Sequence, residues 1–333
     1  MVNRNLKRPA VIAIVFVQLI RISFDVSVFL RKRYVLSILL EVLVSDSTVH
    51  RRSLIKTATV TAVNERRQQF QVPQLAALCM TDAVELWVKA GSDGERLGGD
   101  PLAHQLFMML LLKSEDSQMR FSVLTVNEAK PPPKFREAGF RRSPALQHGE
   151  DVTLSYEDEI VDYMEQAFSF PSLKHSPGEA DDVTADLFRV FCYFIKEVSN
   201  DPKALTNELI RIDRFVGELQ TKFLTGNEMK LIDCKVLSRL HSIRIACKAL
   251  KDYDIPVDLH NLWCYMETGY NSEVFSKSCP SDQEIVLYWA DRPDTPNLLS
   301  SQKRSQLCRQ RPLFTFIIPK ENRDCHEIGM SSS

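Results

Sequence analysis

The stretch that most constrains the fold of this chain runs from Val84 to Lys113 and reads VELWVKAGSDGERLGGDPLAHQLFMMLLLK. Its first seven residues are rich in β-branched and aromatic side chains and predict a buried strand, and the glycines that follow mark a loop. Asp100 and Pro101 then supply an N-cap and a first helical residue, two strong signals for a helix start. Because every residue from 106 to 112 is apolar, we expect a helix that is packed on several sides.

Further segments complete the pattern of an α/β domain over residues 83–168. Alternating side chains predict a strand at 120–127, and the proline-rich stretch 130–135, KPPPKF, is expected to be a rigid extended connector. Residues 141–154 predict two short strands around a turn, and residues 155–168 a helix with acidic first turns, as the helix dipole favours. The order strand, helix, strand, strand, strand, helix fits a small mixed sheet of the thioredoxin type.

The second half of the chain is predicted to be all-helical. After a linker at 169–182 that is rich in Ser, Pro and charge, apolar residues recur every three or four positions in three successive segments. That spacing indicates a helical bundle, and two shorter helices are expected at 257–269 and 272–290. We therefore place an all-helical domain at 183–290 and a tail at 291–333.

An N-terminal extension, residues 1–80, precedes these domains and carries an excess of positive charge. Residues 1–67 hold twelve Lys or Arg and four Asp or Glu, a net charge of +8, so the remainder of a chain whose total is −1 carries −9. Such an arm suits contact with an anionic surface, but a poorly ordered or interfacial extension is the simpler interpretation. Its apolar run from 10 to 20 is too short for a membrane-spanning helix, which takes about 20 residues. A transit peptide and a wrongly assigned chain start stay open.

The eight cysteines predict neither a disulfide framework nor a metal site. They include no Cys-x-x-Cys pair and no spacing with histidines that suits zinc. Cysteines within apolar helical stretches are typical of a reducing compartment, so a cytoplasmic protein is expected. We expect neither a metal ion nor nucleic acid as a partner.

Four long motifs carry a family resemblance: LWVKAGSDGERLGGDP, HQLFMMLLLK, FLTGNEMKLIDCKVLSRLH and CPSDQEIVLYW. They resemble the chloride intracellular channel family of the glutathione transferase superfamily, in the family's order and over about residues 83–290. KPPPKF and the Asp of GGDP resemble its nematode excretory-canal-type branch. The resemblance implies a thioredoxin-like domain with a mixed sheet, followed by an all-helical domain of glutathione transferase type. It also implies a soluble cytoplasmic protein that associates conditionally with intracellular or plasma membranes and is linked there to chloride transport.

The resemblance makes Asp100 and Pro144 the positions of a vestigial glutathione site. Pro144 matches the family's cis-proline, whose cis bond presents backbone groups to a peptide-like ligand. Vertebrate members carry a cysteine where this chain has Asp100, and a thiol at a helix N-terminus has a lowered pKa. A carboxylate instead caps the helix, with the N–H groups of residues 102 and 103 as donors, and it can form no mixed disulfide. We expect no thiol–disulfide chemistry at this position and no cofactor, with glutathione disfavoured.

A second family motif, FLTGNEMKLIDCKVL at 223–237, resembles a helix-capping box and not a catalytic site. Asp233, at the third helical position, is expected to accept a hydrogen bond from the N–H of residue 230. Lys230 stands at the N-cap, where Ser or Thr is usual. Because its side chain has no acceptor, half of the reciprocal box is missing.

The segment Pro101–Val126 matches the family's proposed membrane-crossing region. Its candidate membrane residues are Pro101, Leu106, Leu110 and Val126, and its later charges are Lys113, Glu115, Asp116 and Arg120. Charges near a bilayer centre cost about 2.5–3.5 kcal/mol each, so four cost on the order of 10 kcal/mol unless they snorkel. A spanning form therefore requires that the first domain unfold and that several chains associate. Membrane lipids, chloride ions and, within membranes, further copies of the chain are the expected partners.

Three functions stay open at this point. The first is a chloride intracellular channel-like protein that acts at membranes in anion transport. The second is a glutathione-dependent oxidoreductase, against which the chemistry of Asp100 counts. The third is a non-catalytic scaffold with a glutathione transferase-like fold that uses the surface of its helical domain.

Overall fold

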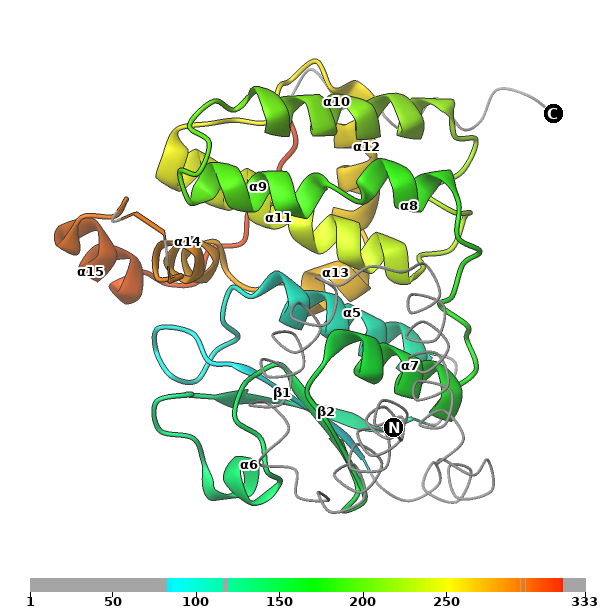
Figure 1. Cartoon of the computed structure of the whole chain (residues 1–333), viewed down its shortest axis with the longest axis vertical. Coiled ribbons are helices and arrows are strands. Elements are labelled where there is room, and N and C mark those ends of the chain that lie inside the picture. Colours follow the sequence, from blue (N-terminus) through cyan, green and yellow to red (C-terminus); the bar gives the residue numbers. More distant parts are fainter. Residues whose placement is uncertain (1–82, 116–118, 294, 297, 320–333) are drawn as a thin grey trace, which may run out of the picture. The chain divides into compact units, whose positions relative to one another are not determined.

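The computed structural model describes residues 83–115, 119–293, 295, 296 and 298–319 of the 333-residue chain (Figure 1). The chain divides into two units, residues 1–71 and 72–333, and all described residues belong to the second. The expected extension 1–80 therefore lies outside the described residues, as do residues 320–333 of the expected tail.

A four-stranded mixed sheet forms the first domain, with strand order β2-β1-β3-β4. The strands are β1 (Val84–Lys89), β2 (Phe121–Val126), β3 (Ala145–His148) and β4 (Val152–Leu154). Central β1 is parallel to β2, with Val84 beside Phe121, and antiparallel to β3, with Val84 beside His148. Its inner residues are buried, as a run of β-branched and aromatic side chains predicts. The expected sheet of the thioredoxin type is confirmed.

Helices cover both faces of this sheet. α5 (Pro101–Glu115) and α7 (Glu157–Ala167) lie on one face, above the sheet in Figure 1, and share an apolar core with it. α6 (Pro133–Glu137) belongs to a second apolar core on the other face. Because successive side chains of a strand point to opposite faces, Leu86 enters the first core and Trp87 the second.

The prediction of an extended connector at 130–135 is wrong for residues 133–135. Pro132 is extended, with φ −64° and ψ 156°, but Pro133 begins helix α6. A proline at the first helical position loses no hydrogen bond, because the N–H group there has no intrahelical partner. The turn of helix allows Phe135 to be buried against Trp87, with ring centroids 5.6 Å apart.

The second domain is all-helical, as the apolar spacing predicts. Its helices are α8 (Glu179–Thr184), α9 (Leu187–Ile195), α10 (Lys203–Glu218), α11 (Leu231–Lys251), α12 (His260–Tyr270), α13 (Glu273–Ser278) and α14 (Asp282–Ala290). α11 is central and packs against α9, α12 and α14. It also packs against α5, so α5 lies between the sheet and the helical domain.

Three boundaries differ from those expected. α8 begins within the expected linker at 169–182. The helix expected at 272–290 is the pair α13 and α14, because Pro280 cannot continue a helix and favours extended backbone at Cys279. The expected tail contains α15 (Ser301–Arg309) and a segment without helix or strand, residues 311–319, here named the C-terminal strap. α15 buries no residue, so it has no apolar periodicity from which it could be predicted.

Candidate functional site

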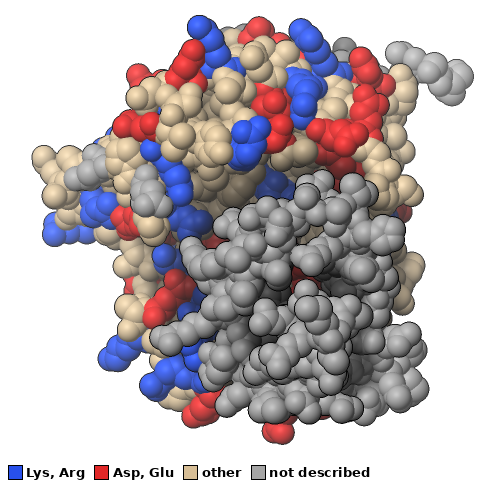
Figure 2. All heavy atoms as spheres, viewed as in Figure 1, with Lys and Arg blue, Asp and Glu red and all other residues tan. Residues whose placement is uncertain are grey.

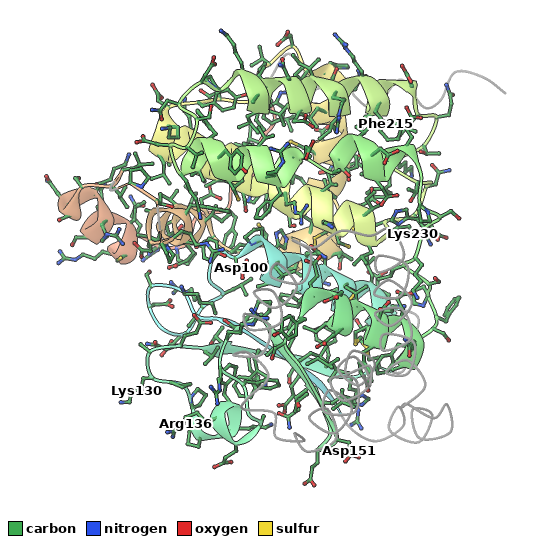
Figure 3. The ribbon with its side chains drawn as sticks, in the orientation of Figure 1. Asp100, Lys130, Arg136, Asp151, Phe215 and Lys230 are labelled. Carbon is green, nitrogen blue, oxygen red and sulfur yellow. The ribbon has the colours of Figure 1, made fainter. Side chains whose placement is uncertain are left out.

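Asp100 directly precedes α5, close to where the sheet domain meets the helical domain (Figure 3). Its Oδ1 atom accepts a hydrogen bond of 3.1 Å from the N–H of Leu102. Its backbone carbonyl accepts the first bond of the helix, 3.1 Å from the N–H of His104. The further bond expected from the N–H of residue 103 is not among the hydrogen bonds of the described residues. The carboxylate thus satisfies one of the donors that a helix start leaves unpaired.

The glycine-rich loop before Asp100 is hydrogen-bonded to α14 of the helical domain. The Glu284 carboxylate accepts hydrogen bonds from the Ser92 backbone N–H at 2.8 Å and from the Ser92 hydroxyl at 2.5 Å. A Cβ atom on Gly99 would lie 2.4 Å from the backbone oxygen of Glu284. No larger residue fits there without a shift of α14, so these glycines serve the contact between domains as well as the turn.

Tyr288, one turn after Glu284 on α14, lies near Asp100. Burial is the largest influence on the Asp100 carboxyl and raises its pKa. The N–H of Leu102, the nearby Tyr288 hydroxyl and the charges of Arg292 and Lys89 oppose the rise. Burial, followed by the adjacent Asp100 charge, raises the pKa of Tyr288, so the phenol stays protonated and can donate to the carboxylate.

Three cations among the described residues of this region are not held in an ion pair, although Arg292 and Lys89 act on Asp100 and Arg239 interacts with Glu157. Arg292 lies 4.8 Å and Lys89 5.8 Å from the centroid of the Tyr288 ring. Arg239 of α11 lies 4.7 Å from the centroid of the Phe188 ring. Within the described part of the chain, none of these three side chains makes a hydrogen bond or an ion pair. The positive charges of Arg292 and Lys89 therefore favour the ionised form of the Asp100 carboxyl.

No thiol in these helices replaces the missing nucleophile. Cys192 of α9 interacts electrostatically with Arg239 and Arg292, but burial raises its pKa. Burial also raises the pKa values of Cys234 and Cys247 on α11. All three are therefore thiols and not thiolates at neutral pH, and the thiolate is the reactive form.

The peptide bond between Ser143 and Pro144 is cis, and Pro144 is buried. The Ser143 N–H donates a hydrogen bond of 2.9 Å to Glu128 Oε1, and the Ser143 hydroxyl donates one of 2.7 Å to the same atom. This backbone donor is therefore already paired within the chain. It would have to leave Glu128 in order to bind a peptide-like ligand.

A pocket of about 400 Å³ opens beside the start of α7. Its polar lining residues are Gln105, Glu157, Asp158, His175, Asp181 and Lys235. Two of its carboxylates already have partners, since Glu157 accepts a bond of 2.9 Å from Gln105 and Asp181 lies 3.0 Å from His175. In the described ranges no group of three or more His, Cys, Asp or Glu side chains could hold a metal ion.

Comparison with known proteins places the chain in a family. Residues 82–171 match the CLIC-like N-terminal domain. Over 240 residues the chain is 44% identical to the chloride intracellular channel exl-1 of Caenorhabditis elegans, a match that covers 70% of this chain and 98% of that protein. The chain belongs to the chloride intracellular channel family.

Solved structures agree with this assignment. The CLIC homologue EXC-4 of C. elegans is 27% identical, with a TM-score of 0.64, and the match covers 73% of this chain and 96% of that one. Glutathione transferase Omega 1C of Trametes versicolor is 12% identical, with a TM-score of 0.50 over 66% of this chain and 100% of its own. This last similarity supports the glutathione transferase-like fold alone.

The capping motif of this chloride intracellular channel protein lies at the start of α11, where Figure 3 labels Lys230. The Lys230 N–H donates to Asp233 Oδ2 at 2.9 Å, and the Lys230 backbone carbonyl accepts from the Asp233 N–H at 3.0 Å. Asp233 Oδ1 also accepts from the Leu224 N–H at 2.9 Å and from the Tyr265 hydroxyl at 3.0 Å. The carboxylate therefore ties three segments of the helical domain together, more than a local cap does.

The candidate membrane residues do not share one surface. Pro101, Leu106 and Leu110 are buried in α5, and the two leucines belong to the core between the sheet and its helices. Val126 belongs to the core on the opposite face of the sheet. No helix in the described part of this chloride intracellular channel protein is long and apolar enough to cross a bilayer.

Sequence reasoning missed the residues of α14 that complete the site. Glu284 and Tyr288 lie in the family motif CPSDQEIVLYW, but Glu284 follows its partner Ser92 by 192 residues. Their spacing of four residues puts both on one helical face, the only signal that the sequence offered for a shared role.

Proposed function

We propose that this chloride intracellular channel-family protein is a folded cytoplasmic protein that associates conditionally with membranes and takes part there in chloride transport. The observation that carries the proposal is the 44% identity to the chloride intracellular channel exl-1 over 98% of that protein. The shared length includes both domains, and not only the matched N-terminal domain at 82–171. Lipids, chloride and, in the membrane, further copies of the chain are its partners.

Conditional association accords with the position of the family's membrane segment. α5 packs on the sheet and on α11, so its apolar side chains are inside the folded protein. Membrane insertion therefore follows a rearrangement that separates α5 from both. Such a rearrangement exposes apolar area that a bilayer can bury in place of the protein core.

The proposal excludes glutathione-dependent thiol chemistry. Asp100 cannot form a mixed disulfide, and Cys192 is held as a thiol by burial. The Ser143 N–H, which a glutathione peptide would use, already binds Glu128 at 2.9 Å. These residues do not fit glutathione as a cofactor.

Two measurements on the full-length protein test the proposal. In liposome flotation, the protein should move with vesicles under some condition of pH or redox potential, and recruitment under none of them would refute it. In planar bilayers, purified protein should give single-channel currents whose anion selectivity changes with Arg120→Glu, within the expected membrane segment. Currents with unchanged selectivity would show that the ions pass elsewhere.

A further inference from the structure

The C-terminal end of the described structure is basic in an otherwise acidic part of the chain. Residues 300–319, here named the basic C-terminal surface, contain four Lys or Arg and no Asp or Glu. The four are Lys303, Arg304, Arg309 and Arg311. Arg304 pairs with Asp291, whereas the other three have no acidic partner in the described part of the chain. In Figure 2 the projection that α15 forms in Figure 1 is mostly uncharged, with Lys or Arg groups along its lower edge.

Within the same stretch of chain, the strap displays large apolar side chains to solvent. Leu313 is 57% exposed, Phe314 47% and Ile317 69%. Among the described residues eight large hydrophobic side chains are exposed, and three of them fall within these five positions of the strap. Single exposed apolar residues need no explanation, but a cluster marks an interaction site.

The strap is held firmly, so this exposure does not come from a frayed end. The Asp282 N–H donates to the Leu313 carbonyl at 2.8 Å, and the Thr315 hydroxyl donates to Asp282 Oδ2 at 2.6 Å. Arg244 donates to the Thr315 carbonyl.

Two further strap residues anchor it to the helical domain. Phe316 packs 5.7 Å from the ring of Phe275, and Ile318 is buried. Because both hydrogen bonds and apolar packing fix the backbone of the strap, its exposed side chains are held at defined positions.

We propose that the basic C-terminal surface docks this protein onto an anionic lipid bilayer. Leu313, Phe314 and Ile317 enter the headgroup region, while the Lys and Arg side chains contact anionic headgroups. The proposal rests on the membrane association proposed above and names the surface that makes first contact. Basic and apolar side chains without acidic ones are the composition of interfacial anchors, and each Lys or Arg near such a surface strengthens binding by roughly fivefold.

Docking of this kind requires no unfolding of the sheet domain. The exposed strap residues are already outside the core, and the bonds of Asp282 and Thr315 can persist on the membrane. The folded protein can therefore be held at the bilayer while α5 is still packed, which makes docking separable from insertion.

Vesicle flotation of the full-length protein tests the charge requirement. With vesicles of phosphatidylcholine and phosphatidylserine, Lys303→Gln/Arg309→Gln/Arg311→Gln should bind at least tenfold more weakly than the parent protein. A control with equal loss of charge, Lys203→Gln/Arg214→Gln/Lys222→Gln on α10 and the loop after it, should bind as the parent does. If the parent binds and the two variants are equal, the docking surface is wrong while the membrane proposal stands. If the parent binds no vesicle, both fail.

A local probe decides whether the strap itself enters the lipid. Ile317 and Val198 are each 69% exposed, and Val198 follows α9 at a distance from the strap in the chain. Fluorescence of Ile317→Trp should shift to the blue and be quenched by brominated lipids, while Val198→Trp should show neither change. Equal quenching at both positions, or none at position 317 in a protein that has bound vesicles, would overturn the proposal in favour of a protein partner for this surface.

Discussion

Lys113 and Glu165 form an ion pair of 2.7 Å that is almost closed to solvent, with side-chain exposures of 0% and 3%. The lysine also donates to the carbonyl oxygens of Phe168 and Pro171, each at 2.7 Å. A charge that interrupts the apolar membrane segment in the sequence is therefore paired inside the folded protein. Separation of α5 from α7 must break this pair, so it opposes membrane insertion of the segment.

The first prediction concerns this pair. Lys113→Met removes one partner and leaves the Glu165 carboxylate buried, which should lower the free energy of unfolding by about 3–5 kcal/mol. Lys113→Met/Glu165→Gln removes both charges and should recover a large part of that loss. Urea denaturation at neutral pH measures all the variants. Equal stabilities of the single and double variants would show that the pair contributes nothing as a pair.

The second prediction concerns the attachment of the glycine-rich loop to α14. Glu284→Ala leaves the Ser92 N–H without its acceptor and should cost about 1–3 kcal/mol of stability. Hydrogen exchange of the amides between residues 92 and 99 should become faster in this variant. Ser92→Ala removes only the hydroxyl bond and should lower the free energy of unfolding by about 1 kcal/mol. The backbone amide of residue 92 should still exchange slowly in this variant. Unchanged exchange in Glu284→Ala would mean that the loop is fixed by other contacts.

The third prediction concerns the charge of Asp100. Its folded-state pKa is raised by burial, so the native state binds this proton more tightly than the unfolded chain does. The ionised residue therefore costs stability above its folded pKa, and the cost fades as the pH falls through that value. At neutral pH Asp100→Asn, which keeps an N-cap acceptor, should be at least as stable as the parent, whereas Asp100→Ala should lose about 1 kcal/mol. Thermal unfolding at pH 7 and pH 4 checks the sign, since the advantage of Asn should shrink at the lower pH.

The fourth prediction restores the chemistry that this position lacks. In Asp100→Cys the thiol would stand at the α5 N-terminus beside Lys89 and Arg292, which favour a thiolate. The variant should reduce a mixed disulfide substrate with glutathione, while the parent protein should show no turnover. Asp100→Ser is the matched control, because it caps the helix without a nucleophilic sulfur. Turnover by the parent that disappears in Asp100→Asn would contradict the proposed absence of thiol chemistry.

Local signals in the sequence predicted the elements of the fold well. The strand at β1, the start of α5 at Pro101 and the apolar spacing of α9 to α11 depend on neighbouring residues, and these elements are where they were expected. α6 and α15 were missed, since one follows a proline run that also permits extended backbone and the other buries nothing.

Contacts between distant residues could not be predicted in the same way. Asp100 was recognised at its helix start, but neither Tyr288 nor Glu284 could be assigned to it, because packing and not periodicity brings α14 to the loop. For the same reason Lys113 was expected to be an obstacle to membrane insertion, and its buried partner Glu165 was not foreseen. Residue types and spacing indicate which side chains can pair, but only the fold selects the pairs.

The last prediction concerns His104, which lies buried on α5 against Phe275, with ring centroids 4.7 Å apart. Burial lowers its pKa from 6.5 to about 3. Below pH 6.5 the unfolded chain therefore binds a proton at this histidine, whereas the folded protein does not until the pH approaches 3. The contribution of the neutral ring to the free energy of unfolding is complete above pH 6.5 and is lost as the pH falls toward 3. At pH 5 the loss from this residue should be about 2 kcal/mol relative to pH 7.5.

Urea denaturation at pH 7.5 and pH 5 measures that loss in the parent and in His104→Gln, in which the side chain at position 104 does not titrate. The pH dependence of the variant should be smaller than that of the parent by the His104 contribution. His241, also buried and with a lowered pKa, should continue to destabilise the variant at pH 5. His175→Gln, at a partly exposed contact with Asp181, serves as the surface control. If His104→Gln lost as much stability as the parent between the two pH values, His104 would not be a source of acid sensitivity at the contact between α5 and the helical domain.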